Sequence, residues 1–87
     1  MPGSPGDICA LMARTITAIQ KSILADGRTV EAAQTHLTAL QNSPNPDPAA
    51  VATAKAVLQA AEDTLTSDQN ALEAWTEEYE ADCPQAG

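Results

Sequence analysis

The sequence predicts an all-α fold, an antiparallel two-helix hairpin of the coiled-coil type. Two series of apolar residues, each with alternating spacings of three and four, flank a proline-rich stretch at residues 42–49. Spacing of this kind, sustained over four heptads, is typical of helices that pack along a seam. The composition favours helix over sheet, because the 87 residues contain no Phe and are rich in Ala, Leu, Gln, Glu and Thr. A chain of this length forms one small domain at most.

The first helix is expected over residues 7–41, after a flexible segment at residues 1–6. Nine of its ten seam positions are apolar, and Asp26 is the exception. The seam consists of Cys9, Met12, Ile16, Ile19, Ile23, Asp26, Val30, Ala33, Leu37 and Leu40.

A bend is expected at residues 42–47 rather than a linker between domains. Asn42 suits the end of a helix, Asp47 suits the N-cap of the next, and Pro48 suits its first turn. These residues therefore predict where one helix stops and the other starts.

The second helix is expected over residues 48–82, followed by a tail at 84–87, so that residues 7–83 form the single domain. Pairing the two seams about the bend sets large residues against small ones, for example Leu37 against Ala54 and Val30 against Ala61. A packed seam needs such complementarity. Two helices of about 35 residues give a hairpin about 50 Å long. The second seam consists of Val51, Ala54, Leu58, Ala61, Leu65, Asp68, Leu72, Trp75, Tyr79 and Asp82.

An alternative fold is a compact bundle of three or four shorter helices. Each arm carries a seam aspartate at mid-length, Asp26 beside Gly27 and Asp68 beside Ser67, where a kink or a break could form. Thr29 and Ser67 would then cap new helices. We favour the hairpin, because the heptad phase passes through Gly27 without a slip.

Cys9 and Cys83 lie almost equidistant from the bend, so the hairpin brings them together at its open end. We expect them to form a disulfide, which is the covalent staple that a small domain needs. A bonded pair favours secretion or another oxidising compartment, whereas two free thiols would suit a reducing cytoplasm.

One side of the hairpin is expected to form a flat surface of small, uncharged residues, here called the small-residue face. It occupies the heptad columns next to the seam, where the only large polar residues are His36 and Glu78. Such a surface lets another helix approach closely. The face consists of Leu11, Thr15, Ala18, Ser22, Ala25, Thr29, Ala32 and His36 in the first helix and of Thr53, Val57, Ala60, Thr64, Ala71 and Ala74 in the second.

The charge of −8 is concentrated in the second half of the chain, where nine acids accompany the single base Lys55. Its densest part is an acidic patch of Glu73, Glu77 and Glu80. This charge argues against nucleic-acid binding, which needs Lys and Arg. We also expect no membrane span, since no long uncharged apolar run is evident.

No pattern of catalytic, cofactor-binding or metal-ligating residues is found. The only histidine, His36, lacks the Glu three residues earlier that helical carboxylate–metal sites use. We therefore expect no enzyme activity, no cofactor and no metal site.

These observations favour a non-enzymatic interaction or assembly module that docks through the small-residue face. Its partner would be a second copy of the chain or another helical protein. The alternative is an acidic inhibitor or mimic that presents its second helix to a basic partner.

Overall fold

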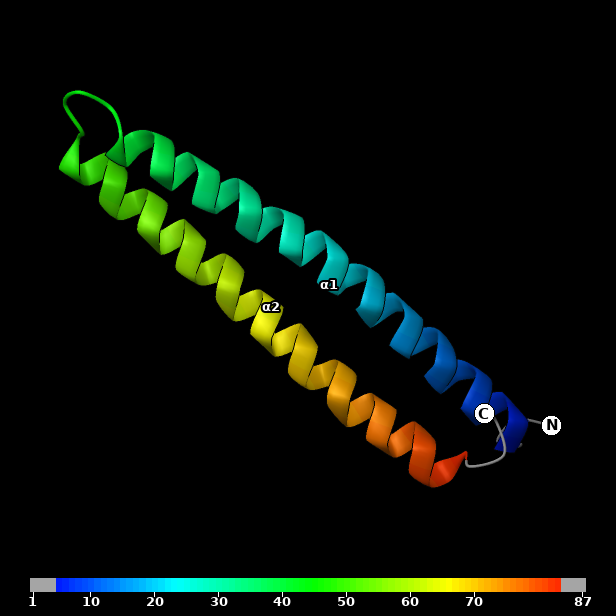
Figure 1. Cartoon of the computed structure of the whole chain (residues 1–87). Helices are drawn as coiled ribbons and strands as arrows, with labels where there is room; N and C mark the ends of the chain where they lie inside the picture. Colours follow the sequence, from blue (N-terminus) through cyan, green and yellow to red (C-terminus); the bar gives the residue numbers. More distant parts are fainter. Residues whose placement is uncertain (1–4, 84–87) are drawn as a thin grey trace.

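The computed structural model describes residues 5–83 and confirms the all-α hairpin. Helix α1 spans Pro5–Gln41 and helix α2 spans Pro48–Asp82, and the two run antiparallel with the bend at one end of the molecule (Figure 1). The chain forms a rod with principal dimensions of 64 × 20 × 14 Å. Helix α1 begins two residues earlier than expected, so residues 5 and 6 belong to it. The expected tail at 84–87, like residues 1–4, lies outside the described residues.

Both helices pass without interruption through the two positions where a break was considered. The hydroxyl of Thr29 donates to the carbonyl of Ala25 at 3.1 Å, so it bonds within α1 and caps no new helix. Ser67 likewise lies in the interior of α2. A glycine in a helix interior costs about 1 kcal/mol, which is too little to break a helix held by packing along its length. The bundle of shorter helices is therefore not formed.

The bend has the cap chemistry that the sequence predicts. Asp47 is the N-cap of α2, with φ −79° and ψ 115°, and its side chain accepts a hydrogen bond from the Ala49 amide at 3.0 Å. Pro48 lies in the first turn, where its missing N–H costs nothing. At the other side of the bend the Asn42 amide donates to the Thr38 carbonyl at 3.0 Å. These bonds fix where each helix ends and starts.

The core is a single seam between the two helices. Among the described side chains, the buried apolar residues all belong to the expected seam or to the disulfide. A two-helix structure has no third layer, so even seam positions such as Ile23 and Leu58 remain half-buried. The buried residues are Met12, Ala33, Leu37, Ala54, Ala61 and Cys83.

Trp75 departs from the seam prediction. As a seam residue it was expected in the core, but it is 39% exposed. Tyr79, one turn later, is half-buried. An indole is too large for one layer of a two-helix seam, and this position places it at the edge of the interhelical groove.

Candidate interaction surface

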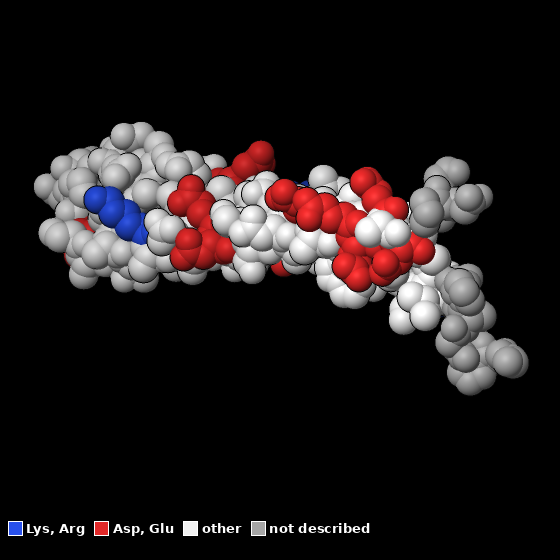
Figure 2. All heavy atoms as spheres, turned by 90° about the horizontal axis from the view of Figure 1, so that it is seen from below, with Lys and Arg blue, Asp and Glu red and all other residues white. Residues whose placement is uncertain are grey.

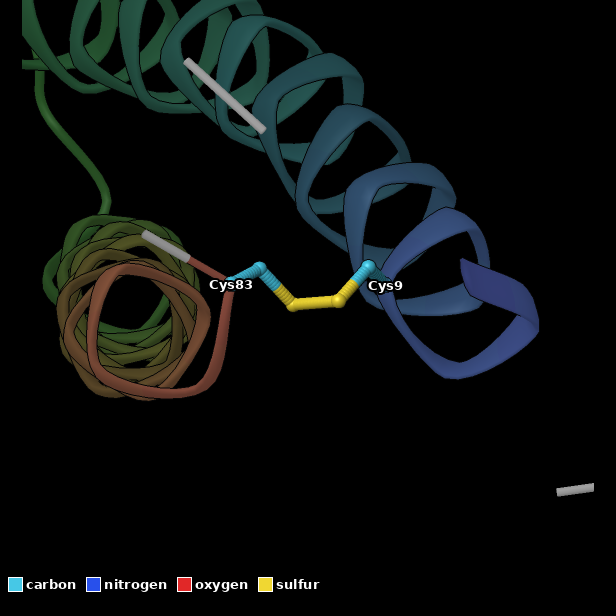
Figure 3. Close-up of a disulfide and its surroundings, with 2 residues drawn as sticks. All are labelled: Cys9 and Cys83. Atoms are coloured by element: carbon cyan, nitrogen blue, oxygen red, sulfur yellow. A yellow bond between two sulfur atoms is a disulfide. The ribbon is translucent and has the colours of Figure 1, made fainter. Parts of the chain in front are cut away.

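The disulfide closes the end of the hairpin opposite the bend. Cys9 of α1 and Cys83, which directly follows α2, are bonded with their Cα atoms 6.0 Å apart (Figure 3). The Cys83 amide donates to the Tyr79 carbonyl at 2.8 Å and so completes the last turn of α2. The predicted pairing of the cysteines is thus present, and it holds the open ends of the two helices together.

The small-residue face is open to solvent along the hairpin. Twelve of its fourteen residues are exposed, and the other two, Thr15 and Ala71, are half-buried. Leu11 is 62% exposed and Val57 is 54% exposed, which is high for aliphatic side chains of this size. Within the described residues, neither helix covers this face.

Three hollows lie between the helices on this same side. The disulfide-end hollow, of about 660 Å³, includes Leu11, Trp75 and Glu78 in its lining. The mid-hairpin hollow, of about 270 Å³, lies beside Thr29 and Ala60. The bend-end hollow, of about 490 Å³, has a lining rich in alanine and includes Ala33, Ala50, Ala54, His36 and Thr53. The face is therefore a shallow groove rather than a plane.

Three of the four threonines of the groove satisfy their own hydroxyl donors. Thr15 and Thr64 donate to the carbonyls of Leu11 and Ala60, both at 3.0 Å, as Thr29 does to Ala25. A hydroxyl that bonds back into its own helix needs no acceptor from a partner. These threonines can thus be covered by an apolar surface without leaving a buried donor unpaired.

The disulfide end of the groove carries a cluster of large, exposed apolar side chains. Ile8 is 49% exposed and, together with Leu11 and Trp75, surrounds the hollow. Sequence reasoning assigned Trp75 to the core and left Ile8 out of the candidate residues. Ile8 lies seven residues before Thr15 in the same heptad column, so the column pattern already places it on this face, although it is not among the candidate residues.

Acidic side chains gather toward the end of the molecule where the termini lie (Figure 2). Glu73, Glu77 and Glu80 of the predicted acidic patch are all exposed. Glu78 and Asp82 line the disulfide-end hollow, and the pKa of Glu78 is raised by its hydrogen bond with Asp82 and by the repulsion between the two carboxylates. The groove thus has an acidic rim at this end.

Asp26 and Asp68 meet across the seam at mid-length. Hydrogen bonding with Asp68, followed by burial and by repulsion from the same carboxylate, raises the pKa of Asp26. One oxygen of Asp26, Oδ2, is covered and has no hydrogen-bond partner. Arg28, two residues after Asp26, is exposed. Two like charges within a seam oppose packing, so this layer weakens the hairpin.

His36, the one histidine of the sequence, lies near the bend. His36 is exposed and lines the bend-end hollow together with Asp47. Among the described residues, no group of three or more His, Cys, Asp or Glu side chains could hold a metal ion.

Helix α1 is long and apolar enough, over Ile8–Gln41, to cross a membrane by length and composition alone. No such segment was expected from the sequence. Only 6% of the qualifying stretch is buried inside the hairpin. In the folded chain, however, α1 is paired along its length with the acidic helix α2 and is bonded to its end. The apolar character of α1 thus lies largely on its exposed side, which includes part of the groove.

No protein-family model matches the chain, and searches of the curated proteins and of the solved structures find no match either.

Proposed function

We propose that the hairpin is a non-enzymatic interaction module that docks a protein partner in the groove of the small-residue face. The observation that carries the proposal is an apolar groove that neither helix covers. It has exposed Ile8, Leu11 and Val57 along it and three threonine hydroxyls that are already satisfied. Soluble proteins seldom leave such a contiguous apolar surface open unless it binds something.

The groove is large enough for a stable interface. The whole side of the hairpin that contains the groove measures at most 64 by 20 Å, or roughly 1,300 Å², and a standard interface needs about 800 Å² from each partner, so a partner would have to cover most of that side. Covering an exposed Leu, Ile or Val side chain contributes about 1.5–3 kcal/mol each. A helical partner suits the surface, because alanine and threonine permit close approach of a second backbone.

The proposal is tested by placing a photo-cross-linking amino acid at Ala60, in the groove. Ala56, one turn earlier in α2 and also exposed, is the matched control because it lies outside the groove. We expect irradiation of the producing cells to give one discrete covalent adduct from position 60 and none from position 56. Equal labelling from both positions, or none from either, would contradict the proposal.

A glutamate scan supplies the second arm. Ala60→Glu adds a charge to the mid-hairpin hollow, whereas Ala56→Glu adds the same charge elsewhere on the same helix. We expect Ala60→Glu alone to abolish binding of the cross-linked partner. Circular dichroism of both variants checks that the hairpin remains folded.

An acidic mimic is the second candidate function, favoured by the concentration of carboxylates at one end of the rod (Figure 2). Here α2 would present Glu73 and Glu77 to a basic partner. The double variant Glu73→Lys with Glu77→Lys separates the two functions. It should leave the adduct from position 60 unchanged if the groove is the docking site, and should remove binding if the acidic patch is.

A further inference from the structure

We infer that the groove binds a second copy of the chain. The two hairpins pack groove to groove, antiparallel and overlapping along their full length, and form a four-helix bundle. This inference rests on the proposed function and names its partner. A symmetric pair uses the same surface twice, so the surface must be complementary to itself. The shape of the groove, the positions of its two large polar residues and the distribution of the acidic residues along the rod are each compatible with that requirement.

The shape of the groove is complementary to itself only in the antiparallel arrangement. At the disulfide end, Ile8, Leu11 and Trp75 are bulky and exposed. At the bend end, the hollow of about 490 Å³ is lined by alanines such as Ala50 and Ala54. An antiparallel pair places bulky side chains in an alanine-lined hollow at both ends. A parallel pair would place bulky against bulky and leave two hollows empty.

The polar residues of the groove are placed to match as well. His36 lies five residues before the end of α1 at Gln41, next to the bend, and Glu78 lies four residues before the end of α2 at Asp82, next to the disulfide. They are thus almost equally far from opposite ends of the rod. When two copies overlap along their full length in opposite directions, each His36 comes level with a Glu78 of the other copy.

His36 and Glu78 also lie on the side of their helices that faces the middle of such a bundle. Each occupies the heptad position directly beside the seam, and each lines a hollow between the two helices. An imidazole N–H can donate to a carboxylate. The bundle would therefore contain two equivalent His36–Glu78 pairs, one near each end.

The charge of the whole chain favours the same direction. Each copy carries −8, with its acidic residues concentrated at the disulfide end. The antiparallel pair holds these ends at opposite ends of a rod 64 Å long, many times the screening length of about 8 Å at physiological salt. A parallel pair would bring them together.

Sedimentation equilibrium of the oxidised full chain tests the inference. We expect a mass of about 18 kDa, twice that of the 9.0 kDa chain, at micromolar concentration. A monomer at millimolar concentration would overturn the inference. So would a position-60 adduct with a different protein, which would still leave the groove as the docking site.

Two leucines of α1 supply a matched pair for the contact surface. Leu11 is 62% exposed and lies in the groove, and Leu24 is 66% exposed and lies outside it. Leu11→Ala should raise the dimer dissociation constant at least about 10-fold, because the contact is lost in both copies, and Leu24→Ala should leave it unchanged. Equal effects of the two variants would overturn the assignment of the groove.

A charge exchange tests the direction. His36→Glu and Glu78→His should each weaken the dimer about 10-fold, and the double variant should return to within about 3-fold of the original. Thr35→Glu adds the same acid at the exposed neighbouring position as a control. If Glu78→His instead strengthens the dimer, equivalent ends lie together and the antiparallel arrangement is wrong.

Discussion

Removal of the disulfide should cost the hairpin a large share of its stability. Cys9 and Cys83 are 74 residues apart, so their bond closes nearly the whole folded chain into one loop. In the chain-entropy treatment a loop of this length destabilises the unfolded state by about 4.5 kcal/mol. The total stability expected for a chain of 87 residues is about 4–13 kcal/mol. The bond therefore supplies about a third of the stability or more.

The assay is thermal unfolding followed by circular dichroism, with Cys9→Ala/Cys83→Ala compared with the oxidised protein. Alanine is preferred to serine because Cys83 is only 6% exposed and a hydroxyl would be buried there. We expect the midpoint to fall by about 20–35 °C, since 1 kcal/mol moves the midpoint of a small domain by about 4–8 °C. The original chain in reductant should behave in the same way, which controls for the lost side chains.

Association would add stability at high concentration, so both proteins are measured over a dilution series. A fall of less than about 5 °C at the lowest concentration would refute the reasoning. It would mean that the seam alone holds the helices together and that the unfolded chain gains little freedom when the bond is absent.

Three further predictions concern individual residues. Gly27→Ala should stabilise the hairpin by about 0.5–1 kcal/mol in urea unfolding, because an added Cβ meets no atom within 4 Å and alanine is the better helix former; a loss of stability would contradict this. Asp47→Ala should cost about 1 kcal/mol, because the Ala49 amide loses its acceptor, while Asp47→Ser should retain most of the stability. The pKa of Asp26 is raised by Asp68, so its stabilising protonation is complete below the ordinary aspartate pKa and is lost as pH rises through the raised value. The thermal unfolding midpoint should therefore be higher at about pH 4 than at about pH 7, and Asp26→Asn should flatten this dependence of the midpoint on pH.

The fold could be predicted because several independent signals in the sequence agree. Heptad spacing, the cap at Asp47 and Pro48, and the position of the cysteines all lead to one hairpin, and the structure has all three features. The extent of burial could not be predicted in the same way. A pattern of apolar positions gives the direction of a side chain but not the depth of the layer that receives it. For this reason Trp75, assigned to the core, lies 39% exposed at the groove.

The local weak points were harder to judge from sequence. Gly27 and Ser67 have the chemistry of helix ends, but their cost to a helix is small beside the packing of the residues around them. The surface of the groove, with Ile8 in its heptad columns, was predictable from the sequence, whereas its hollows and the exposed fractions of its side chains depend on three-dimensional packing. A second copy of the chain as the occupant of the groove stays a prediction from the shape and the charges of the groove.

The bond between Cys9 and Cys83 also determines how the molecule would carry mechanical load. It joins the start of α1 to the end of α2, so a pull applied through the segments outside the two cysteines passes across the sulfur atoms (Figure 3). The part of the hairpin between Cys9 and Cys83 would bear none of that force. In reducing conditions the same pull would separate the two helices one turn at a time, beginning at the end where the disulfide had been. The oxidised hairpin would therefore stay closed under such a pull, whereas the reduced hairpin would open progressively from one end.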